Sequence, residues 1–436
     1  MDSKRKDGVI SHESAVPNPR KTIQNLRGST YTLETAIADL IDNSIEFEAT
    51  RIDIEVSLGG DLIAILDNGQ GMSEETHREA MRLASETREY SSTDLGRFGT
   101  GMKAASLSMA RRLTVATKRI KDDRVLVRRL DVDHIESTND WSVATEVMNP
   151  DSLPIRFVRA LMEHGGTCLL LEKIDKGFGD KHSAEAVKGQ VLSHLSDLEV
   201  HLGLVFHRFL SKEGFNDRKV NISINGTPIR PWDPFCLGED LLVPTMEFDE
   251  VEINLGLDRH ITLQGFVLPR QDEFRSKDQH LAAGGPKKWN ESQGFYVYRN
   301  GRLIRWGGWL KTRSKDEHLK LARLRFDFNA DLDELFSVNI AKSQIELPKV
   351  LRDKIEPYLK LVTQKANERY RNKSKVQLPQ RTPGVSVPAR SFRAAELARL
   401  IEAALQDDRG TLIKLQKIVS DNNPAMAEII NWRHSN

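Results

Sequence analysis

Cysteine is scarce in this sequence, and long apolar runs are absent. The two cysteines, Cys168 and Cys236, lie far apart and belong to no metal-binding motif, which argues against a disulfide framework or a zinc site and fits a reducing cytoplasm. No apolar run approaches the ~20 residues that a membrane-spanning helix needs. The N-terminus, MDSKRKDGVISHES, lacks the apolar core of a signal peptide. The sequence therefore predicts a cytoplasmic protein with no membrane partner.

An excess of charge of one sign is also lacking. The chain has 64 Lys and Arg residues against 63 Asp and Glu residues, so bulk charge gives no argument for nucleic acid, although a local basic patch stays open. Hydrophobic residues make up 39% and charged residues 29%, which is typical of a soluble globular protein. A length of 436 residues favours two domains plus tails.

Hydrophobic periodicity predicts an α+β protein. Apolar residues at helical spacing predict a helix over 33–45, and alternation predicts strands over 51–58 and 61–67 joined by a Gly-Gly turn. Further expected elements of the first region are helices at 73–84 and 102–112 and strands at 113–119, 124–132, 142–148 and 167–173. A helix at 185–210 then leads to a second set of strands at 219–225, 250–257, 260–268 and 294–299.

The same patterns suggest the domain organisation. The expected parts are a polar N-terminal arm (1–20), a first domain (21–180), a second domain (181–348), a basic helix (349–375), a Pro-containing linker (376–390) and a small helical tail (391–436). The basic helix is compatible with contacts to DNA phosphates and equally with a solvated helix face.

The stretch AIADLIDNSIEFEAT places polar groups beside an apolar stripe. Asp39 and Asn43 are four residues apart, so they share one helix face. An amide oxygen can bind Mg²⁺ and a carboxylate can orient a water molecule. Asp42 is expected to face aside. On spacing alone, a helix edge with solvated polar groups explains the pattern as well.

The stretch LDNGQGM follows an apolar strand. Asp67 stands at the strand end and can accept a hydrogen bond from an exocyclic amine such as that of adenine. Gly69 and Gly71 are expected to let a planar ligand approach the backbone closely. An ordinary Asn-Gly turn remains the alternative.

The stretch GRFGTGMKAAS has three glycines before an expected helix start near Met102. Free amides at a helix N-terminus bind phosphate, and Lys103 adds positive charge. The spacing matches neither a P-loop nor a Rossmann fingerprint, and a surface loop is the alternative. A later stretch, GGTCLLLEKI, brings Thr167 into a strand and by itself indicates nothing.

In this order and spacing, the four stretches resemble the motifs of the GHKL ATPases, the class with the Bergerat nucleotide fold. The resemblance implies that Asp39 is the catalytic acid, that Asn43 binds magnesium, that Asp67 binds the adenine amine and that Thr167 supports adenine recognition through water. It also implies that the glycine-rich segment closes over the phosphates of ATP. The nucleotide-binding residues implied are Asn43, Asp67, Gly69, Gly71, Met72, Gly96, Arg97, Phe98, Gly99, Thr100, Gly101, Met102, Lys103 and Thr167.

The resemblance extends over roughly residues 25–350. GFYVYRNGRLIRWGGW, at 294–309, looks like a strand and turn of MORC proteins and their bacterial relatives. VNIAKSQIEL is similar to the segment of MutL and MORC transducer domains that sends a lysine to the γ-phosphate, a role that would fall to Lys342. A surface lysine at a strand end is the alternative. The implied architecture is a Bergerat-fold α/β sandwich ATPase domain, a transducer domain of βαβ type and a helical C-terminal tail.

The implied function is a Mg²⁺-dependent ATPase switch that slowly converts ATP to ADP and phosphate. ATP would bring two copies into a homodimer that clamps DNA or a partner protein, and bacterial relatives of this kind are associated with restriction and antiviral defence. One departure matters, because the family usually has Glu where this chain has Asp39. A displacement of ~1 Å can lower a rate on the order of 10²-fold. A nucleotide-gated scaffold with little turnover, a chaperone-like protein and a protein kinase are the alternatives, and the last lacks a recognisable phosphoacceptor helix pair.

Overall fold

The computed structural model describes residues 16–28, 31–83, 95, 101–146, 154–178, 183–211, 214–256, 259–336 and 345–372. All of these residues belong to one compact unit, which spans residues 1–374. The predicted linker and tail, and most of the predicted arm, lie outside the described residues.

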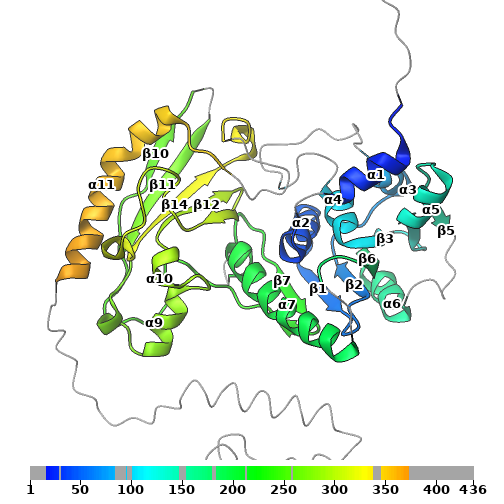
Figure 1. Ribbon diagram of the computed structural model, residues 1–436, viewed down its shortest axis with the longest axis horizontal. Coiled ribbons are helices and arrows are strands. Elements are labelled where there is room, and N and C mark those ends of the chain that lie inside the picture. Colours follow the sequence, from blue (N-terminus) through cyan, green and yellow to red (C-terminus); the bar gives the residue numbers. More distant parts are fainter. Residues whose placement is uncertain are drawn as a thin grey trace, which may run out of the picture. The chain divides into compact units, whose positions relative to one another are not determined.

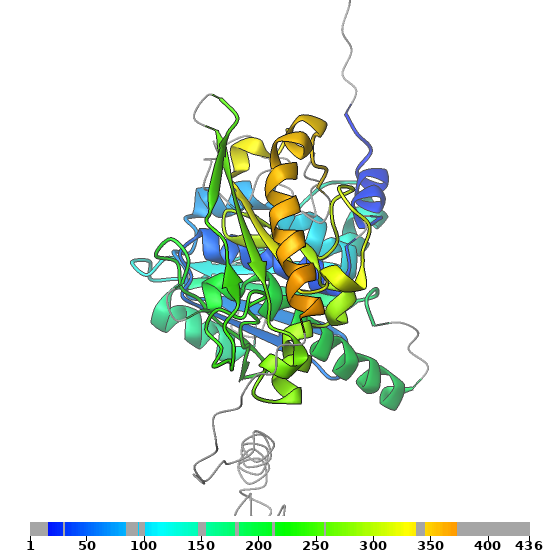
Figure 2. The ribbon, with the colours of Figure 1, turned by 90° about the vertical axis from the view of Figure 1, so that its left-hand side faces the viewer.

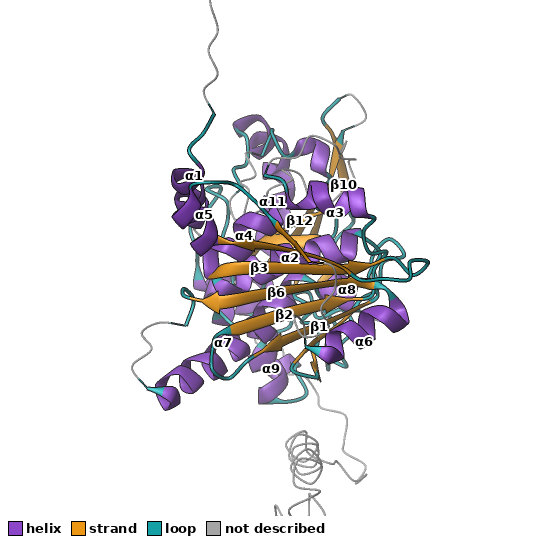
Figure 3. Ribbon diagram, turned by 90° about the vertical axis from the view of Figure 1, so that its right-hand side faces the viewer, coloured by secondary structure: helices purple, strands orange, loops and turns teal. Residues whose placement is uncertain are grey.

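The first sheet is mostly antiparallel and has the order β5-β4-β3-β6-β2-β1-β7-β8 among the described residues. Figure 3 shows its central strands β3, β6, β2 and β1 side by side. Its strands are β1 (Arg51–Val56), β2 (Leu62–Asp67), β3 (Ala110–Lys118), β4 (Leu126–Asp131), β5 (Ala144–Glu146), β6 (Gly166–Ile174), β7 (Asn221–Ile224) and β8 (Thr227–Pro228). The pairing of β1 with β7 is parallel. Residues 219–225 were expected among the second set of strands, and this expectation is wrong, because β7 extends the first sheet instead.

Helices cover both faces of this sheet. They are α1 (Pro19–Arg27), α2 (Leu33–Glu46), α3 (Glu74–Met81), α4 (Gly101–Met109), α5 (Val132–Thr138), α6 (Ile155–His164), α7 (Ala184–Val205) and α8 (His207–Leu210). Alternation along β6 divides the core: Leu169 and Leu171 join the cluster that α2, α4 and α7 also line, whereas Cys168 and Leu170 pack with Phe157 of α6.

The second sheet has the order β10-β11-β14-β12-β13, with β9 paired to β11. Figure 1 labels β10, β11, β14 and β12 of this sheet. Its strands are β9 (Met246–Glu247), β10 (Val251–Asn254), β11 (His260–Val267), β12 (Gly294–Arg299), β13 (Arg302–Trp306) and β14 (Ala322–Phe328). Short helices accompany them: η2 (Gln271–Glu273), α9 (Lys277–Gly284), α10 (Lys288–Glu291), η3 (Glu317–Leu319) and η4 (Ala330–Leu332).

The basic helix predicted at 349–375 is α11 (Lys349–Arg371), which lies across the second sheet (Figure 2). Leu351, Ile355, Leu359 and Val362 repeat at helical spacing and are buried in the core of that sheet. One face of α11 is therefore committed to the fold. None of the described helices is long and apolar enough to cross a membrane.

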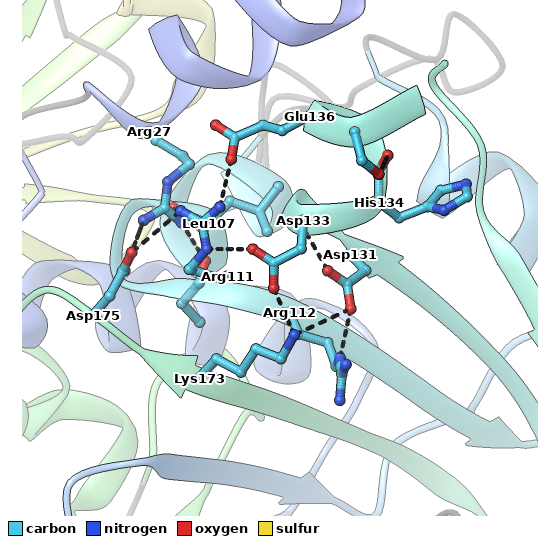
Figure 4. Close-up of polar contacts among 12 residues, drawn as sticks. Arg27, Leu107, Arg111, Arg112, Asp131, Asp133, His134, Glu136, Lys173 and Asp175 are labelled. Atoms are coloured by element: carbon cyan, nitrogen blue, oxygen red, sulfur yellow. Dashed lines mark hydrogen bonds and ion pairs between the residues drawn. The ribbon is translucent and has the colours of Figure 1, made fainter. Parts of the chain in front are cut away.

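A buried arginine fastens α1 to the first domain (Figure 4). Arg27 is 6% exposed, donates to the carbonyls of Leu107 and Ala110, and forms an ion pair with Asp175 at 2.6 Å. Around it, Arg111 contacts Asp133 at 2.6 Å and Glu136 at 2.5 Å. This network joins α1, α5 and the ends of β3 and β6.

Candidate nucleotide-binding site

Helix α2 carries the first group of candidate residues. Thr32 caps its N-terminus by accepting a hydrogen bond from the Thr35 backbone N–H. Asp39 and Asn43 lie on one face, and the Asn43 side-chain amide donates to the Asp39 carbonyl at 3.3 Å. Asp39 is 4% exposed, so it is a buried carboxylate rather than a solvated helix edge.

The Asp39 carboxylate is held by donors from two directions. The Tyr31 hydroxyl donates to Oδ2 at 2.6 Å, and Nη2 of Arg302, on β13, donates to Oδ1 at 3.1 Å. Burial, and then the Asp39 charge, raise the pKa of Tyr31 far above its ordinary value, so this phenol stays a proton donor.

Asp42 does not face aside as expected. It is 1% exposed, and its Oδ1 lies 2.8 Å from Nε of Arg302. The expectation is wrong because residues three apart on a helix are still neighbours on its surface, so Asp39 and Asp42 both reach the same guanidinium.

Asp67 is clamped at the end of β2 by three donors. The Ser44 hydroxyl donates to Oδ2 at 2.8 Å, while the backbone N–H groups of Gly69 and Thr167 donate to Oδ1 at 2.9 and 3.1 Å. Asp67 and Thr167 are direct partners in the β2–β6 register. Burial raises the pKa of Asp67 above its ordinary value, although these three hydrogen bonds oppose the shift.

The glycines after Asp67 are required by the chain itself. A Cβ on Gly69 would lie 2.6 Å from the Phe47 carbonyl oxygen. Gly71 has φ +66°, and a Cβ there would lie 2.2 Å from the Lys118 carbonyl oxygen. Protein backbone thus lies close to both glycines on the side where a side chain would stand. The next residue, Met72, donates its backbone N–H to the Thr117 hydroxyl at 2.9 Å.

The segment expected to bind phosphate is described only from Gly101, where α4 begins. Met102 packs against the first core, and Lys103 is 2% exposed. The Lys103 ammonium donates to the Ala80 carbonyl at 2.6 Å, and burial lowers its pKa to about 8. Gly96, Arg97, Phe98, Gly99, Thr100 and Lys342 lie outside the described residues.

Three residues of this site escaped the motif analysis: Tyr31, Ser44 and Arg302. Ser44 follows Asn43 directly, and its contact with Asp67 joins the helix motif to the strand motif. Two surface clefts in the described part of the chain, of about 370 and 410 Å³, lie elsewhere: Asp39, Asn43 and Asp67 line neither of them.

Comparison with known proteins agrees with this geometry. Residues 31–158 match the family described as histidine kinase-, DNA gyrase B- and HSP90-like ATPases. The chain is 37% identical over 90 residues to mouse ATPase MORC2B, covering 19% of this chain and 9% of that protein. It is 33% identical over 120 residues to human ATPase MORC2, covering 26% and 12%.

A bacterial relative matches as well. The DNA mismatch repair protein MutL of Shewanella sediminis is 38% identical over 89 residues, covering 19% of this chain and 14% of that protein. The matched region thus spans only a small part of each relative. Residues 31–158, which the family model matches, contain the carboxylates of α2 and the Asp67 turn. Residues 31–158 therefore match the ATPase domain of the GHKL class, and the relatives found include MORC and MutL proteins.

Proposed function

We propose that the protein is an ATP-driven switch that binds ATP and hydrolyses it slowly to ADP and phosphate. The observation that carries the proposal is the junction on α2. Asn43 and Asp39 share one face of this helix, and the adjacent Ser44 bonds to Asp67, so a candidate adenine site and a candidate catalytic site meet on one rigid element.

Each residue has a role in this proposal. Asp67 accepts a hydrogen bond from the adenine amine, with Thr167 beside it. Asp39 orients the attacking water as a general base. The amides from Gly96 to Gly101 bind the phosphates, and Lys342 senses the third phosphate. Lys103 would join the phosphate contacts only if its ammonium left the Ala80 carbonyl, to which it donates in this structure.

Asn43 is the residue proposed to hold Mg²⁺. Its side-chain nitrogen donates to the Asp39 carbonyl, which leaves the amide oxygen to act as a ligand. One protein oxygen fits an ion that is otherwise bound by substrate phosphates and water, because Mg²⁺ retains water readily. When bound, the ion would neutralise phosphate charge.

The switch is proposed to act through association. ATP binding brings two copies into a homodimer that clamps DNA or a partner protein, in a bacterial defence setting or a related one. Light scattering with and without a non-hydrolysable ATP analogue tests this step. An unchanged mass would contradict it.

A nucleotide-gated scaffold is the second candidate function. Asp39 is one methylene shorter than Glu, and both of its oxygens already accept hydrogen bonds from Tyr31 and Arg302. In that case ATP would bind and change the protein with little turnover.

Phosphate release with Mg-ATP separates the two functions, provided that nucleotide binding is measured in parallel. We expect slow turnover by the wild type, binding without turnover by Asp39→Asn, and weakened binding by Asn43→Ala. Asp61→Asn is the matched control, because this carboxylate lies in an exposed turn and bonds to Ser57. Wild-type release equal to that of Asp39→Asn would favour the scaffold.

A further inference from the structure

The turn between β12 and β13 presents two arginines side by side. Asn300 and Gly301 have φ angles of +48° and +80°, as a two-residue hairpin loop of type I′ requires. Arg299 and Arg302 are therefore direct partners across the hairpin and point to the same face. Gly301 cannot be replaced without displacing the turn or the Phe215 ring, since a Cβ there would lie 2.3 Å from that ring.

Arg302 reaches from the second sheet to the carboxylates of α2. Its Nη2 lies 3.1 Å from Asp39 and its Nε 2.8 Å from Asp42, so one planar fork contacts two side chains. Arg302 is 4% exposed, and its guanidinium carbon lies 5.9 Å from the centre of the buried Phe206 ring. The Arg302 guanidinium thus faces two buried carboxylates.

Arg299 contacts two further segments of the chain, at Asp333 and at Leu95. It forms a paired ion bridge to Asp333, with distances of 2.7 and 2.8 Å, and its Nη1 donates to the Leu95 carbonyl at 2.8 Å. Leu95 is 1% exposed and directly precedes Gly96. The hairpin therefore contacts the catalytic helix and the residue before the glycine-rich segment at once.

This arrangement does more than join two domains. Burying charged groups carries a desolvation penalty that apolar contacts avoid, and a buried ion pair is weak support for stability. What a guanidinium adds is direction, since an N–H group fixes the orientation of a carboxylate to which it donates, as Nη2 of Arg302 does to Asp39, whereas the contact of Nε with Asp42 is an ion pair without hydrogen-bond geometry. The Asp39 carboxylate has its orientation set by Tyr31 on one oxygen and Arg302 on the other.

We propose that the β12–β13 hairpin couples the second domain to the nucleotide site, with Arg302 as the positioning residue for Asp39 and Arg299 as the anchor of the chain at Leu95. The inference concerning turnover rests on the proposed role of Asp39. The coupling itself rests only on the contacts of the two arginines.

The test compares four variants of the full chain. Arg302→Gln removes the charge and the fork, and Arg302→Lys keeps the charge alone. The double variant Asp42→Asn with Arg302→Gln removes one anion and one cation, so the cluster keeps its wild-type net charge and folding is protected. Arg305→Gln is the matched control, because Arg305 is an arginine of the same strand that pairs with Val297, beyond the register shift and away from the hairpin loop.

Steady-state phosphate release and nucleotide affinity are measured on each. We expect kcat to fall about 10- to 100-fold in Arg302→Gln and in the double variant, with nucleotide affinity within about 3-fold of wild type. Arg302→Lys should recover part of the loss, and Arg305→Gln should match wild type. A double variant with the wild-type kcat would overturn the proposal, since Arg302 would then only balance charge.

Hydrogen exchange provides a readout that needs no turnover. In the wild type, a non-hydrolysable ATP analogue should change amide exchange in residues 294–306, and Arg302→Gln should bind the analogue without that change. The same response in both proteins, or none in the wild type, overturns the coupling. A wild type that shows this response but releases no phosphate refutes the proposed hydrolysis and leaves the coupling supported.

Discussion

Acid is expected to destabilise this protein through two buried imidazoles. His77 is fully buried and His207 is 7% exposed, and burial lowers the pKa of each to about 3 from an ordinary 6.5. Arg128 near His77, and Arg208 near His207, lower the pKa further in the same direction. The folded protein keeps both rings neutral, whereas the unfolded chain takes up a proton on each below its ordinary pKa. Their contribution to stability is therefore complete above about pH 6.5 and is lost progressively as the pH falls toward about 3.

The magnitude follows from the pKa difference. A pH near 5 is about 1.5 units below the pKa of an imidazole in the unfolded chain, and each unit corresponds to about 1.4 kcal/mol. Between about pH 6.5 and pH 5, each histidine therefore lowers the free energy of unfolding by about 2 kcal/mol, and the pair lowers it by about 4 kcal/mol. Urea unfolding near pH 7 and near pH 5 measures this loss. His77→Gln should lose about 2 kcal/mol less than wild type over that interval, whereas His164→Gln, at an exposed position, should lose as much as wild type. An equal loss in wild type and His77→Gln would refute the reasoning.

Three further substitutions test the fold and the site. Arg27→Met removes a buried cation that bonds to two carbonyls and a carboxylate, and should lower the free energy of unfolding by about 3 kcal/mol in urea titration; a loss under about 1 kcal/mol would contradict the network. Gly71→Ala should lower it by about 3 kcal/mol because of the positive φ and the backbone clash, while Gly238→Ala, with open space around its Cα, should change it by under about 1 kcal/mol. Asp67→Asn should leave the urea midpoint near that of wild type but lower ATP affinity at least about 10-fold in calorimetric titration, because an amide replaces the acceptor for the adenine amine; unchanged affinity would remove Asp67 from the site.

Local pattern predicted much of what positions the site. The apolar spacing from Leu33 to Ile45 predicted a helix that the structure bounds at Leu33 and Glu46. Alternation predicted β1, where Ile52, Ile54 and Val56 are buried in turn. These predictions succeed because helix and strand periods are properties of neighbouring residues.

The contacts that fix the candidate catalytic carboxylate were not predictable in the same way. Arg302 lies 263 residues from Asp39, and their pairing depends on how the second sheet meets α2. The local signal was only Asn300-Gly301, which indicates a tight hairpin without indicating its partner. Asp42 was misplaced because its immediate neighbour Asn43 was taken to define the functional face. Sequence spacing does not reveal a cation that arrives from another domain.

The place of β7 bears on how the protein can be divided for experiment. Residues 221–224 form the strand that pairs with β1, and β8 pairs with β7 in turn. A fragment ending near residue 180 would leave the backbone groups of β1 without this partner and would present a bare strand edge, the kind of surface that recruits other chains into aggregates. The shortest soluble form of the nucleotide-binding domain should therefore continue past α7 to Pro228. Insolubility of a shorter fragment would then reflect both the exposed sheet edge and the loss of core residues that α7 supplies, such as Val191 and Leu198.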